Sequence, residues 1–305
     1  MREHIATFLK GFAMGAANVV PGVSGGTIAF ITGIYERLID ALKAFDLKAL
    51  KLASKFQIAE LWAKIDGRFL LSLGLGVIAS VLTLAKVLKW GFDEHPVLIW
   101  SLFFGLIAAS IPSVGKMVKT WSGGVMALFL LGLAIAVSMA FLTPASTNEN
   151  PLYLLLCGVA AMCSMIIPGL SGSFVLLLMG NYELIAIETI NTLRQGNLGE
   201  ALPILIPVGS GAVVGLLVLS RFLSWLFKTH HDKAVGAITG FVAGSLVIIW
   251  PWKDTIEKNG KIVRFENWHL PDLTAGATWM QIGAVLIGVS LIVVVELFAR
   301  KNQKS

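Results

Sequence analysis

The chain has little charge and almost no cysteine. Asp, Glu, Lys and Arg make up only 14% of its 305 residues, against about 25% in an average soluble domain. This shortage excludes a soluble globular protein of this size and predicts an integral membrane protein. The two cysteines, Cys157 and Cys163, lie in one apolar segment. We expect them to pack there rather than to form a disulfide or a metal site.

A signal-peptide cleavage site is also missing. No small-residue site follows the basic residues Arg2 and Lys10, so we expect the first apolar segment to belong to the folded protein. The net charge of +6 is modest, and the basic residues lie at segment ends and in loops. That placement fits membrane topology and anionic lipid, and it predicts no nucleic-acid partner.

Two stretches lack the unbroken apolar run of about 20 residues that a crossing helix needs. Six other runs approach this length and predict crossings at 69–91, 97–112, 121–142, 203–227, 234–250 and 279–298. The two broken stretches pair 5–20 with 27–45, and 152–167 with 174–190. We expect each pair to be a re-entrant helical hairpin (5–45 and 152–190), since protein must bury non-helical backbone at membrane depth.

The distribution of Lys and Arg predicts the orientation. With the N-terminus inside, most basic residues fall on the inner side, so both termini are expected in the cytoplasm. Residues 46–66 predict an amphipathic helix on the inner surface. The outer loop 251–278 contains Asn259-Gly260 between extended residues, which predicts a small β-hairpin.

The two broken stretches belong to an internal repeat. At an offset of 147, Pro21-Gly22, Ser24-Gly25 and Tyr35-Glu36 match Pro168-Gly169, Ser171-Gly172 and Tyr182-Glu183. At an offset of 135, a second block aligns, including Trp90 with Trp225, His95 with His230, and Lys86 with Arg221. We therefore divide the chain into halves 1–145 and 150–305, each with one hairpin and three crossings. Three is odd, so the second half is inverted. The predicted fold is an all-α polytopic membrane protein with an inverted-topology repeat.

Each break predicts an anion site, with phosphate the common guest. A helix restarts near Thr27 or Phe174, where backbone N–H groups lack intrahelical partners and hydroxyls add donors. The candidate phosphate-binding residues are Ser24, Gly25, Gly26, Thr27, Ser171, Gly172 and Ser173, together with the cations Lys86 and Arg221. The alternatives are helix packing and capping for the small residues, and snorkelling to the headgroups for the cations.

Other polar residues near the breaks are candidates for coupling or gating. Glu36 and Glu183 follow a matched Gly-x-Tyr and could carry protons or hold a cation, or could simply lie near the interface. The hydrogen-bonding candidates are Tyr35, Tyr182, Asn18 and Asn181. We expect no catalytic residue, metal site or cofactor.

The motifs "NVVPGVSGGTIAFITGIYERLI" and "IPGLSGSFVLLLMGNYE", with the full-length layout, resemble the DUF368 family. That family is associated with polyprenyl-phosphate (undecaprenyl-phosphate) translocases of bacterial membranes. The resemblance implies a multi-pass protein of the bacterial cytoplasmic (inner) membrane that flips this carrier lipid from the outer to the inner leaflet, for recycling in envelope synthesis. Its expected partners are polyprenyl phosphate and the bilayer, and a homo-oligomer is left open. We expect alternating access around the two hairpins.

The main alternative is a lipid pyrophosphate phosphatase. "PGLSGS" is similar to the motif of the undecaprenyl-pyrophosphate phosphatase family, but Gly172 and Gly25 stand where that family has an arginine. Residues 5–20 also carry no acid, so charge stabilisation and general-base catalysis lack carriers. A transporter of another lipid or a small anion is a second alternative.

Overall fold

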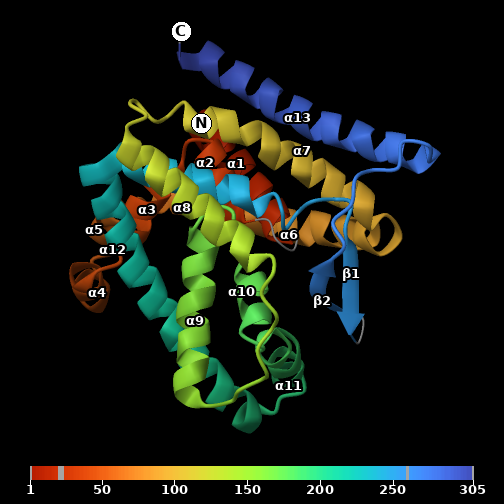
Figure 1. Ribbon diagram of the computed structural model, residues 1–305. Coiled ribbons are helices and arrows are strands. Elements are labelled where there is room, and N and C mark those ends of the chain that lie inside the picture. Colours follow the sequence, from red (N-terminus) through yellow and green to blue (C-terminus); the bar gives the residue numbers. More distant parts are fainter. Residues whose placement is uncertain (1, 20–23, 259–260, 304–305) are drawn as a thin grey trace. The chain divides into compact units, whose positions relative to one another are not determined.

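The computed structural model describes residues 2–19, 24–258 and 261–303. Its helices, in chain order, are α1 (Arg2–Val19), α2 (Gly25–Ile31), α3 (Tyr35–Lys43), α4 (Leu47–Ser54), α5 (Ile58–Lys64), α6 (Gly67–Glu94), α7 (Pro96–Gly115), α8 (Gly123–Met139), α9 (Pro151–Ile166), α10 (Gly172–Leu178), the π-helical turn η1 (Leu184–Glu188), α11 (Thr189–Arg194), α12 (Leu198–Ser245) and α13 (Gly276–Gln303). Two strands, β1 (Asp254–Lys258) and β2 (Lys261–Glu266), pair antiparallel. The described part of the chain is helical apart from this β-hairpin (Figure 1).

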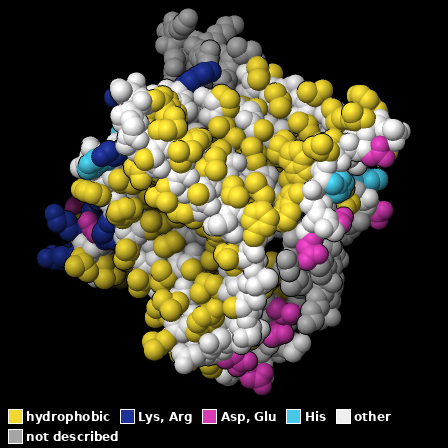
Figure 2. All heavy atoms as spheres, in the orientation of Figure 1, with side chains coloured by type: hydrophobic (Ala, Val, Ile, Leu, Met, Phe, Trp, Pro, Cys, Tyr) yellow, Lys and Arg dark blue, Asp and Glu magenta, His cyan; other side chains and the backbone are white. Residues whose placement is uncertain are grey.

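The long helices have the composition of membrane spans. In the described part of the chain, α6, α7, α12 and α13 are long and apolar enough to cross a membrane, and α8 and α9 are shorter apolar helices. Large hydrophobic side chains such as Leu82, Val218 and Leu286 are exposed on them. Figure 2 shows hydrophobic side chains over most of the visible helix surface. Soluble proteins rarely expose so much apolar surface. The prediction of a helical, polytopic membrane protein is confirmed.

Each hairpin returns as short helices, although the sequence predicts one continuous helix. The predicted segment 27–45 is α2 followed by α3, and 174–190 is α10 followed by η1 and α11. The chain turns at Gly33 (φ +70°) and Gly180 (φ +74°), a pair that the first repeat offset aligns. This left-handed conformation ends a helix most easily at glycine. Matching backbone hydrogen bonds close the two turns: Ile34 N–H to Ala29 O, and Asn181 N–H to Leu176 O.

The predicted amphipathic helix at 46–66 is also divided, into α4 and α5. Asp46 caps α4 by accepting a hydrogen bond from Ala49 N–H at 2.9 Å. Between the two helices Phe56 has a φ of 54°, which interrupts a right-handed helix. The β-hairpin predicted within 251–278 is confirmed by β1 and β2, while its turn residues, Asn259 and Gly260, lie outside the described residues.

Two histidines mark equivalent helix breaks. His95 separates α6 from α7 with φ −139° and ψ 55°, and His230 bends α12 with φ −138° and ψ 48°. Each ring lies 5.8 Å from the ring of a preceding tryptophan, Trp90 or Trp225. The predicted segments 203–227 and 234–250 are therefore the two arms of α12 on either side of His230. The sequence offset of 135 aligns these arms with α6 and α7.

The chain forms two compact units, Met1–Leu82 with Leu142–His231, and Thr83–Phe141 with Asp232–Ser305. Each unit takes one part from each predicted half. In the first unit, α1 packs on α6 as α9 packs on α12. Gly11 lies against the Leu73 carbonyl, and its repeat equivalent Gly158 lies against the Val208 carbonyl. The reciprocal contacts also match: Gly76 with the Phe8 carbonyl, and Gly211 with the Leu155 carbonyl.

The second unit shows the same correspondence. Gly105 of α7 lies against the Val285 carbonyl of α13, and Figure 1 shows these two helices side by side. Gly240 of α12, which the second repeat offset aligns with Gly105, lies against the Phe129 carbonyl of α8. The contact of Gly105 with α13 is thus matched by a contact of Gly240 with α8.

Candidate functional site where the two hairpins meet

The start of α2, directly after Ser24, is capped from within the chain. Ser24 Oγ accepts a hydrogen bond from Gly26 N–H at 3.1 Å. Gly25 N–H donates to Asn18 Oδ1 at 2.7 Å, and Thr27 N–H donates to Ser24 O at 3.0 Å. The expectation of bare N–H groups here is therefore wrong, because an amide side chain and the N-cap serine already satisfy them. Pro21 and Gly22 lie outside the described residues.

Side chains of the first hairpin bind the backbone of the second hairpin. Three hydrogen bonds join them: Ser24 Oγ to Met165 O at 3.3 Å, Gly169 N–H to Thr27 Oγ1 at 2.7 Å, and Tyr35 OH to Ile166 O at 3.1 Å. All three side chains are buried, and Tyr35 is only 2% exposed. The two broken segments therefore meet, although they belong to opposite halves of the sequence.

A pocket of about 280 Å³ lies at this junction. It is lined by residues of α1, α2, α3, α9 and α12: Met14, Asn18, Gly25, Gly26, Leu38, Leu42, Met162, Met165, Ile166 and Leu216. Asn18 and the glycine backbone are its polar groups, and among these lining residues none carries a charge. An amphiphile with a small polar head and an apolar tail matches this lining better than a fully solvated ion does.

The two glycines at the pocket leave no room for a side chain. A Cβ on Gly25 would lie 2.8 Å from the Asn18 amide, and a Cβ on Gly26 would lie 2.7 Å from the Ile166 carbonyl oxygen. Both distances are shorter than a carbon atom tolerates. Any side chain at Gly26 would therefore push the two hairpins apart.

The second break, residues 167–171, is built differently. Ser171 is the N-cap of α10, but its side chain makes no capping hydrogen bond among the described residues. Its Oγ instead shares a hydrogen bond with Ser173 Oγ at 2.7 Å. A Cβ on Gly172 would lie 2.7 Å from Met165 Cγ, which is a flexible side chain. These residues do not line the pocket, so Ser24 and Ser171 have different polar surroundings although the repeat matches them.

Asn181 has a structural role in this arrangement. It is fully buried, accepts from Asn148 N–H at 2.8 Å and donates to Asn148 O at 2.7 Å. Thr147 Oγ1 also donates to Gly180 O at 3.0 Å. The segment before α9 is therefore tied across the turn of the second hairpin. Tyr182 packs against a buried apolar cluster made by Leu154, Cys157, Leu176, Leu184 and Ile185.

The remaining predicted residues lie away from the pocket. Arg221 is exposed, and its Nη1 donates to Leu217 O of its own helix at 2.7 Å. Lys86 lies in α6, with a side chain outside those that the structure describes. Glu183 is exposed just before η1. Neither Arg221 nor Glu183 is brought to the junction.

Glu36, in the first turn of α3, belongs to a charged region along this helix. Its carboxylate lies 3.4 Å from His231 Nε2, and Asp40 on the same helix lies 3.0 Å from Lys228 Nζ. Nearby, the Ala49 amide and Lys64 hold the pKa of Asp46 below its usual value. All these residues belong to segments predicted on the inner side, so the first unit brings the predicted inner segments together.

Sequence reasoning missed the groups of the second hairpin that hold the junction. They are the carbonyls of Met165 and Ile166 and the amide of Gly169, and backbone groups leave no residue signature. The offset of 147 does place Met165 opposite Asn18, and this pairing could have identified both as neighbours of the break.

Comparisons with known proteins identify the family. A family model described as undecaprenyl phosphate translocase-like matches residues 14–263. A protein of Vibrio cholerae serotype O1 named polyprenyl-phosphate transporter is 39% identical over 254 residues, which cover 83% of this chain and 80% of that protein. A protein of Staphylococcus aureus with the same name is 29% identical over 256 residues, covering 80% of this chain and 85% of that protein. No solved structure matches. The chain belongs to the undecaprenyl phosphate translocase-like family.

Proposed function

We propose that the protein transports polyprenyl phosphate, the substrate that the names of its relatives give. The direction is from the outer to the inner leaflet of the bacterial cytoplasmic membrane, which returns the carrier lipid for envelope synthesis. The observation that carries the proposal is the pocket at the junction of the hairpins, where Asn18, Gly25 and Gly26 stand among leucines and methionines.

The chemistry of the pocket suits a lipid monophosphate. Asn18 Nδ2 can donate to a phosphate oxygen, and rotation of the amide away from Gly25 would release that N–H as a second donor. Asn18 Oδ1 thus occupies, at 2.7 Å from Gly25 N, the place that we assign to a phosphate oxygen. The prenyl chain would lie along Leu38, Leu42 and Leu216. Burying the head still requires many hydrogen bonds, since an unpaired anion in low dielectric is costly.

Ser171 and Ser173 form the second phosphate-binding site that we propose along the transport path. Their hydroxyls pair with each other at 2.7 Å and can turn toward an arriving phosphate. The phosphate would pass from the pocket of the first break to this hydroxyl pair as the protein changes between outer-open and inner-open states. Glycine–carbonyl contacts repeated between the two halves support an inverted repeat, the architecture that alternating access commonly uses.

The same pocket supports transport over hydrolysis. Its described lining contains no carboxylate, imidazole or cation to act as a general base or to stabilise a pentavalent phosphate. The proposal is therefore transport, with the lipid pyrophosphate phosphatase as the alternative that the assay below tests.

The test is a flipping assay with labelled polyprenyl phosphate in proteoliposomes. Wild-type protein should flip the lipid faster than empty liposomes, and Ser24→Ala and Ser171→Ala should each slow it. Wild-type flipping at the rate of empty liposomes would contradict the function. Normal rates in both variants would contradict the site and leave the function standing. Release of inorganic phosphate from the lipid pyrophosphate, lost in Ser24→Ala, would favour the phosphatase alternative.

A further inference from the structure

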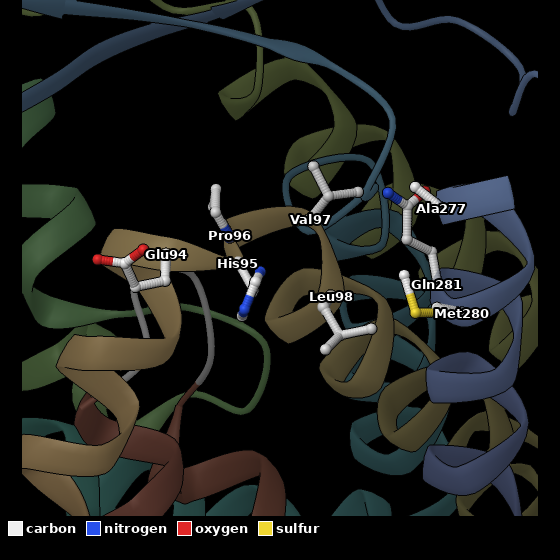
Figure 3. Close-up of a pocket in the computed structure, with 8 residues that line it drawn as sticks. All are labelled: Glu94, His95, Pro96, Val97, Leu98, Ala277, Met280 and Gln281. Carbon is white, nitrogen blue, oxygen red and sulfur yellow. The ribbon is translucent and has the colours of Figure 1, made fainter. Parts of the chain in front are cut away.

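A second pocket, of about 340 Å³, lies in the second unit where α6 ends and both α7 and α13 begin. It is lined by Glu94, His95, Pro96, Val97, Leu98, Ala277, Met280 and Gln281. Figure 3 shows Glu94 and Gln281 at opposite ends of this group, with His95 and the apolar side chains between them. The pocket shares no residue with the hairpin junction, and the proposed transport mechanism does not use it.

The orientation of the Gln281 amide is fixed. Its Oε1 accepts a hydrogen bond from Trp252 Nε1 at 2.8 Å, and an indole can only donate. The Gln281 nitrogen must therefore be the group left to bind a ligand, and Figure 3 shows it on the side of Val97. One end of the pocket consequently offers two N–H donors.

The helix starts give this end a positive character. Val97 and Leu98 lie in the first turn of α7, and Ala277 lies in the first turn of α13. The Leu98 N–H is already bonded to His95 O at 3.1 Å, but both first turns still present the positive end of the helix dipole. His95, held edge-on to Trp90 at 5.8 Å, adds a ring N–H beside them. A phosphate diester matches these donors.

The other end of the pocket, at Glu94, carries negative charge. Glu94 is exposed, and within the described part of the chain neither its carboxylate nor the His95 ring has a hydrogen-bond partner. A carboxylate at this end of the pocket would repel a phosphate monoester, which carries up to two negative charges. It would attract an ammonium group. The lining thus discriminates against polyprenyl phosphate and favours a zwitterion.

We propose that this pocket binds the headgroup of a zwitterionic aminophospholipid, with its ammonium group on Glu94 and its phosphate on Gln281 and His95. The apolar floor of Pro96, Leu98 and Met280 receives the glycerol and the first acyl carbons. Exposed tryptophans on either side, Trp90 and Trp279, are typical of the headgroup layer, where such a lipid would be found.

Native mass spectrometry of the full chain tests this proposal. The protein would be released from nanodiscs that contain equal amounts of phosphatidylethanolamine, phosphatidylcholine and phosphatidylglycerol. Phosphatidylethanolamine should be retained about threefold more often than either competitor, because its ammonium can donate hydrogen bonds to Glu94. Equal retention of the three lipids would overturn the proposal.

Variants separate the two ends of the pocket. Glu94→Gln should abolish the preference for phosphatidylethanolamine, whereas Glu149→Gln, an exposed acid outside the pocket, should preserve it. Gln281→Leu should lower retention of all three lipids, and His230→Ala, at the equivalent helix break, should leave retention unchanged. An unchanged preference in Glu94→Gln would refute the assignment. So would displacement of phosphatidylethanolamine by an equal amount of polyprenyl phosphate, because the pocket would then be a substrate site.

Discussion

The first hairpin contributes side chains to the junction, and the second hairpin contributes backbone. Ser24, Thr27 and Tyr35 reach across to the carbonyls and amide of residues 165–169. The residues matched to them by the repeat are Ser171, Phe174 and Tyr182, and Phe174 has no hydroxyl. One motif in two copies has thus taken two roles. The first copy contributes Gly25 and Gly26 to the pocket lining, and the second copy lies outside that lining.

The turns of the two hairpins also differ in how closely the rest of the chain covers them. Gly180 is covered by the carbonyls of Ala145 and Ser146, and Asn181 holds Asn148 from both sides. A Cβ at the equivalent Gly33 would meet nothing within 4 Å among the described residues. The turn of the second hairpin is thus covered by the segment before α9, whereas the turn of the first hairpin is open at Gly33 and is held by Lys10 Nζ, which donates to Thr32 O at 2.8 Å.

Gly26→Ala should have the largest effect. Its Cβ would meet the Ile166 carbonyl, which cannot move aside, so overpacking should cost about 1–3 kcal/mol of stability and transport should fall at least about tenfold. Gly172→Ala meets Met165 Cγ at 2.7 Å, a side-chain atom that can shift, and the Ala161 carbonyl oxygen only at 3.0 Å, so it should cost less. Thermal unfolding in detergent and the flipping assay measure both. Equal losses in the two variants would remove the asymmetry between the hairpins.

Thr27→Val should have the next largest effect. It keeps the shape of the side chain but leaves the buried Gly169 N–H without its acceptor, at a cost of about 1–3 kcal/mol. Thr27→Ser retains the acceptor and should recover most of the stability, as measured by thermal unfolding. A Val variant as stable as wild type would show that the junction does not depend on this hydrogen bond.

The two tyrosines provide a smaller, matched test. Tyr35→Phe loses the hydrogen bond to Ile166 O and should destabilise the protein by about 1 kcal/mol. Tyr182→Phe should change stability little, because its hydroxyl has no hydrogen-bond partner among the described residues. Chemical denaturation of both variants decides this. A larger loss in Tyr182→Phe would reverse the proposed roles of the hairpins.

Arg221→Ala should have the smallest effect. The guanidinium binds its own helix and lies away from the pocket, so transport should change by less than about twofold. A tenfold loss in the flipping assay would restore the sequence-based assignment of Arg221 to the phosphate.

The sequence predicts much of the fold because the repeat carries several residues that seldom match by chance. The breaks, the two turns at Gly33 and Gly180 and the histidine bends all recur at fixed offsets. The division of residues 46–66 was not predictable, because Phe56 adopts a conformation that its type disfavours. The site was predicted only in part. Asn18 and Ser24 were identified as polar, but their use as internal caps depends on distances that only the folded chain has.

The most direct test of the phosphate site is the substitution Asn18→Asp. The new carboxylate can still accept from Gly25 N–H, so the cap and the thermal stability should be preserved. Its charge would repel a phosphate in the pocket, and the affinity for polyprenyl phosphate should fall at least about tenfold, while that for the uncharged polyprenyl alcohol stays the same. Equal affinity of the Asn18→Asp and wild-type proteins for polyprenyl phosphate would contradict the assignment.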